Sequence, residues 1–210
     1  MLLFKYTLIV SGGLGSLDAA ALEETAELLQ IAERSGDDFT LACARFVRGL
    51  TLVASDNLGH MDGLALLASA REAAIQERFT LATAWLVDTY LAVEKARTGD
   101  LDGAIELSRA VIEDGFASGG TIYVAWPIAI LVEALLRRGT DGDIQDAQIA
   151  IDRLPAVPSV INDIRLLRLR ALLARAQGDE DGYRDYRDRY RKTANDLGLE
   201  GHMEWAEAME

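Results

Sequence analysis

Four glycines at near-constant spacing constrain the fold of this chain most. Gly59, Gly99, Gly139 and Gly178 lie 40, 40 and 39 residues apart, and each stands between two segments with apolar residues at helical spacing. Glycine readily ends a helix because it adopts φ > 0 without a steric penalty. A repeat of about 20–50 residues with two helices per unit is typical of a solenoid, in which each hairpin buries its apolar face against the next. The sequence therefore predicts an all-α fold, an α-solenoid of stacked helical hairpins.

The clearest of these hairpins runs from Phe79 to Glu113. Apolar residues recur at helical spacing in both halves, and Gly99 with Asp100 separates them. We expect Gly99 to end the first helix and Asp100 to cap the second. The tetrapeptide Phe-Thr-Leu-Ala at 79–82 also stands 40 residues earlier, at 39–42. This recurrence supports the 40-residue period independently of the glycines.

We expect one helical-repeat domain over residues 1–210. Its hairpins should span about 1–35, 39–77, 79–116, 120–154 and 159–197, followed by a capping helix at 200–209. Pro127 removes one backbone hydrogen bond, so its helix should be kinked or should start late. The segment 1–10 is ambiguous between a strand and a short first helix, because its β-branched and aromatic content favours a strand and its position favours a helix.

Composition limits the classes of partner. Half the residues are apolar, 26% are charged and the net charge is −13, which is typical of a soluble globular protein and argues against binding nucleic acid or anionic membranes. No apolar run approaches the roughly 20 residues needed to span a bilayer. The single cysteine, Cys43, cannot form an intrachain disulfide. These features favour a cytoplasmic protein.

Motifs for catalysis or metal binding are not found. His60 and His202 have no ligands at metal-binding spacing, and neither a phosphate loop nor a nucleophile elbow occurs. The aspartates at 141–152 lack the central glycine of a calcium-binding loop, and helix capping explains them better. We therefore predict no catalytic residue, no metal site and no cofactor.

A run of tyrosines and arginines near the C-terminus has a structural explanation. Tyr183, Tyr186 and Tyr190 are spaced by three and four residues, so they share one helix face and should pack on the preceding helix. Arg184 and Arg189 each have a carboxylate four residues away on the solvated side. We expect the ion pairs Arg184–Asp188 and Asp185–Arg189.

Two resemblances become visible at this point. Gly99 followed by Ala104, with Ala92 in the preceding helix, resembles the helix-turn-helix signature of tetratricopeptide repeats, although the 40-residue period exceeds that family's 34 and the large aromatic position is not kept. Residues 197–209, together with 133–139 and the Gly-Asp repeats, resemble the C-terminal end of large actinobacterial signalling proteins. Those proteins join a class III adenylate cyclase domain to a signal-transduction ATPase and finish in a helical-repeat region.

The first resemblance implies where a partner would bind. In tetratricopeptide arrays the first helix of each hairpin lines a concave groove, and its ligand positions are counted back from the turn glycine. Counting back thirteen, ten and six residues gives columns that mix small, aromatic and charged side chains. The predicted partner-binding residues are Phe46, Thr89, Trp126, Glu133, Arg165 and Arg168. The alternative is that Trp126 belongs to the core and the arginines are solvated.

Together these observations predict a non-catalytic scaffold that binds a protein segment or a small effector in its groove. The second resemblance implies the regulatory C-terminal part of a cyclase/ATPase signalling protein. Two alternatives stay open, namely the sensor arm of a transcription activator and a small-molecule enzyme with an unrecognised groove site. The sequence also leaves open whether the chain forms homo-oligomers.

Overall fold

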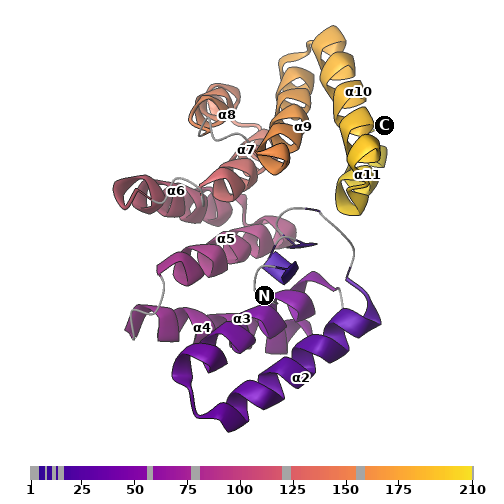
Figure 1. Cartoon of the computed structure of the whole chain (residues 1–210). Coiled ribbons are helices and arrows are strands. Elements are labelled where there is room, and N and C mark those ends of the chain that lie inside the picture. The colour runs from indigo at the N-terminus through magenta and orange to yellow at the C-terminus, as the bar shows by residue number, and fades with distance from the viewer. Residues whose placement is uncertain are drawn as a thin grey trace. The chain divides into compact units, whose positions relative to one another are not determined.

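The computed structural model describes residues 5–7, 9–10, 13, 17–55, 59–76, 81–119, 124–154 and 159–209 (Figure 1). All regular secondary structure in these residues is helical, which confirms the all-α prediction. The helices are α2 Ala19–Ser35, α3 Asp38–Ala54, α4 His60–Gln76, α5 Leu81–Thr98, α6 Leu101–Ala117, α7 Ala125–Arg138, α8 Asp143–Asp152, α9 Val160–Gln177, α10 Glu180–Leu197 and α11 Glu200–Glu207. Residues 5–7 and 9–10 are helical too, which favours the helical interpretation of that segment.

The chain divides into two compact units, one of Met1–Val87 with Leu199–His202 and one of Asp88–Gly198 with Met203–Glu210. In the first unit α3 packs against both α2 and α4. In the second unit α7 packs against α6, α8 and α9, while α9 also contacts α8 and α10. Packing of these helices on their neighbours in sequence is the arrangement of an α-solenoid of stacked hairpins.

The repeated Gly-Asp-x-x-Gly segments form two of the helix-to-helix turns of the second unit, between α5 and α6 and between α9 and α10. Gly99 has φ = 92°, and the carboxylate of Asp100 accepts a hydrogen bond from the backbone N–H of Gly103 at 3.0 Å. A Cβ atom on Gly103 would come within 2.4 Å of that carboxylate, so a larger residue there would displace the capping side chain from its present position. The segment that begins at Gly178 (φ = 75°) repeats the arrangement at 2.9 Å. Local chemistry thus sets these helix ends.

The first unit contains a close crossing of α3 and α4. A Cβ atom on Gly49 of α3 would lie 2.8 Å from the carbonyl oxygen of Gly63 on α4, and one on Gly63 would lie 3.0 Å from the carbonyl oxygen of Gly49. The two backbones therefore approach as closely as only glycine allows. The repeat glycine Gly59 starts α4, since its carbonyl accepts the first helical hydrogen bond from Gly63 at 2.8 Å.

Pro127 lies in the first turn of α7, so its effect is a helix that starts late. Val124 is the N-cap and α7 begins at Ala125. The backbone N–H groups of a first helical turn have no intrahelical acceptor, so a proline there costs no hydrogen bond. Ile128, Val132 and Leu135 of this helix are fully buried and form the centre of the core in the second unit.

Two of the three tyrosines of α10 are buried, as predicted. Tyr183 is 7% exposed and Tyr190 is fully buried, and α10 packs against α9. The Tyr183 hydroxyl donates a hydrogen bond to the backbone carbonyl of Met209, which holds the end of the chain on this hairpin. Tyr183 and Tyr190 therefore belong to the core, whereas Tyr186 is only partly buried.

One of the two ion pairs predicted on α10 is present. Arg189 lies 3.2 Å from Asp185, four residues before it. Arg184, however, contacts Asp181 at 3.5 Å and not Asp188. The Asp188 carboxylate instead accepts from Arg187, its neighbour in sequence, at 2.8 Å. The second predicted pair is therefore wrong, because a different guanidinium occupies that carboxylate.

Candidate functional site

Two of the six predicted partner-binding residues lie in the core. Phe46 in α3 of the first unit and Thr89 in α5 of the second are each 1% exposed. Side chains this buried stabilise the fold and present almost no surface to a partner. The helical position counted from the turn glycine was therefore insufficient to find the exposed face.

Three other predicted residues meet in the second unit. Arg168 of α9 holds Glu133 of α7 with both terminal nitrogens: Nη1 donates to Oε1, and Nη2 donates to Oε2 at 3.1 Å. The Arg168 side chain is 19% exposed and that of Glu133 is 30% exposed. Burial would lower the pKa of Arg168, but the charge and hydrogen bonds of Glu133 outweigh it and raise that pKa. The forked geometry thus joins α7 to α9 at a half-buried position.

Arg165 brings a second guanidinium to the same carboxylate. It lies one turn before Arg168 on α9 and is 9% exposed. Burial lowers its pKa to about 10; the neighbouring Arg168 also lowers it, whereas Glu133 raises it. At neutral pH the side chain still carries its charge. The three side chains form what we call the Arg–Glu–Arg cluster (Glu133, Arg165 and Arg168), in which one carboxylate faces two cations.

Two aromatic residues that the counting scheme missed complete the cluster's surroundings. The Arg168 guanidinium carbon lies 5.2 Å from the ring centre of Trp205 in α11, within range of a cation–π contact, and Trp205 is 38% exposed. Tyr190 is fully buried, and this burial raises the pKa of its hydroxyl. Nε of Arg168 is buried without a hydrogen-bond partner among the described residues. Trp205 belongs to the C-terminal segment that carries the signalling-protein resemblance, but no periodicity links it to α9.

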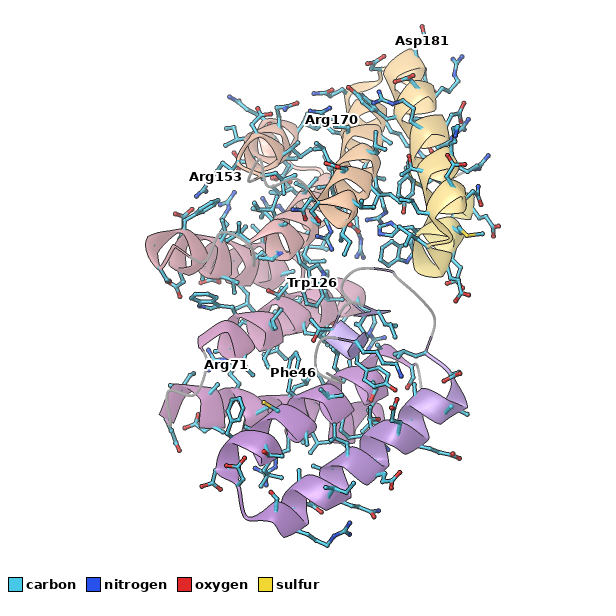
Figure 2. All side chains as sticks on the ribbon, viewed as in Figure 1. Phe46, Arg71, Trp126, Arg153, Arg170 and Asp181 are labelled. Atoms are coloured by element: carbon cyan, nitrogen blue, oxygen red, sulfur yellow. The ribbon has the colours of Figure 1, made fainter. Side chains whose placement is uncertain are left out.

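Trp126 lies on α7 two turns before Glu133 (Figure 2). Its ring packs edge-on against Tyr90, with ring centres 5.9 Å apart and planes at 64°. Trp126 is half-buried. Trp126 therefore contributes to packing and also presents a partly exposed aromatic surface. The core interpretation and the partner-binding interpretation of this residue each apply in part.

A second candidate site is a groove between α6 and α8, floored by α7. Its volume is about 240 Å³, and we call it the α6–α8 groove. The floor is apolar: Ile112, Leu131 and Ala150 are at most 6% exposed. Ile149 on α8 also lines the groove and is 51% exposed. The groove thus combines a buried apolar floor with one exposed aliphatic side chain.

Two ion pairs cross the α6–α8 groove. Arg109 of α6 contacts Asp146 of α8 at 2.6 Å, and Glu113 of α6 contacts Arg153 at the end of α8, also at 2.6 Å. Arg153 additionally lies over the ring of Phe116 at 4.8 Å, and its hydrogen bond is the main cause that lowers the pKa of Glu113. The partners are 37 and 40 residues apart. A search for opposite charges 40 residues apart, one repeat, would have found the Glu113–Arg153 pair but not the Arg109–Asp146 pair.

A more buried charged junction joins α7 to the start of α8. The Asp143 carboxylate, 3% exposed, accepts from Arg138 Nη2 at 2.6 Å and from Arg138 Nε at 3.0 Å. It also accepts from the backbone N–H and the hydroxyl of Thr140, both at 2.8 Å. The Arg138 hydrogen bond is the largest cause that holds the pKa of Asp143 well below its usual range. Asp143 is thus a structural residue of the turn, but the capping prediction is wrong for it, because the N-cap of α8 is Gly142 and no side chain caps that helix.

Within the described ranges, no three His, Cys, Asp or Glu side chains gather in a way that would hold a metal ion. None of the described helices has both the length and the apolarity to cross a bilayer. Comparisons with protein-family models, curated proteins and solved structures found no match.

Proposed function

We propose that this chain is a non-catalytic interaction module that binds a protein segment or small effector in the cytoplasm, as the regulatory C-terminal part of a cyclase/ATPase signalling protein. The observation that carries the proposal is the surface around the Arg–Glu–Arg cluster. Arg168 donates two hydrogen bonds to Glu133 and lies against the partly exposed ring of Trp205. Arginine and tryptophan are the residues most enriched at binding hot spots.

The cluster suits recognition better than chemistry. Both oxygens of the Glu133 carboxylate accept hydrogen bonds from Arg168, so this carboxylate positions that guanidinium. A partner segment would instead contact the exposed part of Trp205 and the accessible edges of Arg168 and Glu133. Preorganised side chains lower the entropy cost of such contacts.

A binding experiment tests the proposal. The purified chain is titrated against the cyclase domain and the ATPase domain of the signalling proteins that it resembles, using isothermal calorimetry. We expect binding to one of them and at least a tenfold loss of affinity for Trp205→Ala. Phe39→Ala is the matched control, because Phe39 is an aromatic residue of similar exposure (44%) in α3 of the first unit. Binding to neither domain, or equal losses in the two variants, would refute the proposal.

A turnover assay tests the non-catalytic part. The repurified chain should form no cyclic AMP and hydrolyse no ATP above the rate of a buffer blank. Activity that persists through repurification and disappears on substitution of a residue in this chain would contradict the proposal.

A further inference from the structure

The charges around the α6–α8 groove follow an alternating pattern. On α6 the cation Arg109 precedes the anion Glu113 by one turn, whereas on α8 the anion Asp146 precedes the cation Arg153. Each ion pair spans the groove, with one residue on the α6 edge and the other on the α8 edge. The Arg109–Asp146 pair forms one level along the groove, and the Glu113–Arg153 pair forms the next. Each edge and each level therefore carries one positive and one negative charge.

This pattern is complementary to a copy of itself. If two such faces meet about a two-fold axis along the groove, Arg109 of one copy faces Asp146 of the other, and Glu113 faces Arg153. If the axis runs across the groove, Arg109 faces Glu113 and Asp146 faces Arg153. In both arrangements every charge meets its opposite. A two-fold dimer needs this property, because it pairs the same surface patch of both subunits.

From this geometry we infer that the α6–α8 groove is a self-association face whose occupant is a second copy of this chain. The side chains are available for such contacts. Those of Arg109 and Arg153 are 51% and 42% exposed, and those of Asp146 and Glu113 are 46% and 64% exposed. Each guanidinium makes one hydrogen bond to its carboxylate across the groove, and a guanidinium has five donors. The remaining donors can bind carboxylates of the second copy.

The apolar part of the groove fits the same occupant. Ile149 stands between Asp146 and Arg153 in sequence and is 51% exposed, so in a two-fold dimer each copy presents one aliphatic side chain to the other copy's groove. The volume of about 240 Å³ is below the roughly 300–1,000 Å³ of small-molecule sites and accommodates an aliphatic side chain. A nucleic acid or an acidic peptide would meet as many carboxylates as guanidiniums, so the four charges offer it no net attraction.

Sedimentation equilibrium on the whole chain tests the inference. Between about 10 µM and about 1 mM, a range that covers weak dimers, the wild type should associate reversibly into a dimer. Ile149→Asp should stay monomeric over this range. Ile31→Asp is the matched control, since Ile31 on α2 is equally exposed at 50% and lies outside the groove, and it should dimerise like the wild type. A monomeric wild type, or equal association of the two variants, would overturn the inference.

Charge reversal tests the electrostatic part separately. Arg153→Glu places two anions on one level of the groove and should abolish the dimer while leaving the helical circular dichroism unchanged. Reversing all four residues (Arg109→Asp, Glu113→Arg, Asp146→Arg and Arg153→Glu) inverts every charge and recreates a self-complementary pattern. This fourfold variant should dimerise again. If it stays monomeric with native helicity, or if Arg153→Glu dimerises like the wild type, the self-complementary charge pattern does not hold the copies together.

Discussion

Replacing Glu133 with glutamine should destabilise the second unit more than removal of either arginine that it faces. The Glu133 charge attracts both Arg165 and Arg168, and these two repel one another. Glu133→Gln therefore loses two attractions and keeps the repulsion. Arg168→Met loses one attraction and also removes the repulsion. Arg165→Met should have the smallest effect, because its lowered pKa shows that the site disfavours its charge.

The magnitudes follow from exposure. Breaking a fully buried ion pair by removing one partner costs about 3–5 kcal/mol. Here the Glu133 and Arg168 side chains are 30% and 19% exposed, so water can partly replace a lost partner. We expect a loss in the free energy of unfolding of roughly 2–3 kcal/mol for Glu133→Gln and roughly 1–2 kcal/mol for Arg168→Met. Arg165→Met should be neutral or slightly stabilising, as apolar replacements of buried charges often are.

Urea unfolding followed by far-ultraviolet circular dichroism at neutral pH measures these differences. For a chain of this length each kcal/mol corresponds to roughly 2–4 °C in melting temperature, so thermal melts provide a second reading. The double variant Glu133→Gln/Arg168→Met should lose less than the sum of the single variants, because the two side chains interact directly. If Arg168→Met or Arg165→Met is the most destabilising variant, the balance of charges does not determine how much the cluster contributes to the free energy of unfolding.

Three further predictions concern other parts of the chain. Gly63→Ala should lower the melting temperature despite a helix-propensity gain of about 1 kcal/mol. The new Cβ atom would lie 2.7 Å from a Val53 methyl carbon and 3.0 Å from a backbone oxygen on α3. A rise in melting temperature would show that α3 and α4 separate easily. The depressed pKa of Asp143 means that its contribution to stability is complete above the unfolded pKa near 3.8 and is lost as the pH falls below it. Asp143→Asn should therefore be less stable at neutral pH and should show a shallower loss of urea resistance between neutral pH and about pH 3, whereas an unchanged acid slope would contradict the assignment. Burial raises the pKa of the Cys43 thiol. At neutral pH this thiol should therefore react more slowly with a disulfide reagent in the folded protein than in urea. Equal reaction rates in the two states would contradict the effect of burial on Cys43.

Glycines and aspartates at the turns determined much of the fold locally. Where a Gly-Asp-x-x-Gly segment occurs, positive φ ends one helix and the carboxylate caps the next, so the boundaries around Gly99 and Gly178 follow from neighbouring residues alone. The late start of α7 also follows from Pro127, because proline is tolerated in the first turn of a helix and not in its interior. These interactions act within one or two helical turns and are therefore readable from the sequence.

The candidate sites depended on tertiary structure. The sequence placed Glu133, Arg165 and Arg168 on a predicted binding face, yet only the packing of α7 on α9 made them one cluster. The same counting selected Phe46, which packing buries. A periodic pattern fixes the turn of the helix on which a residue stands, but the angle and rotation at which two helices cross decide whether that residue faces the core, another charge or solvent. Those quantities come from contacts between segments some 35–40 residues apart in the chain, such as Arg168 with Glu133 and Arg153 with Glu113.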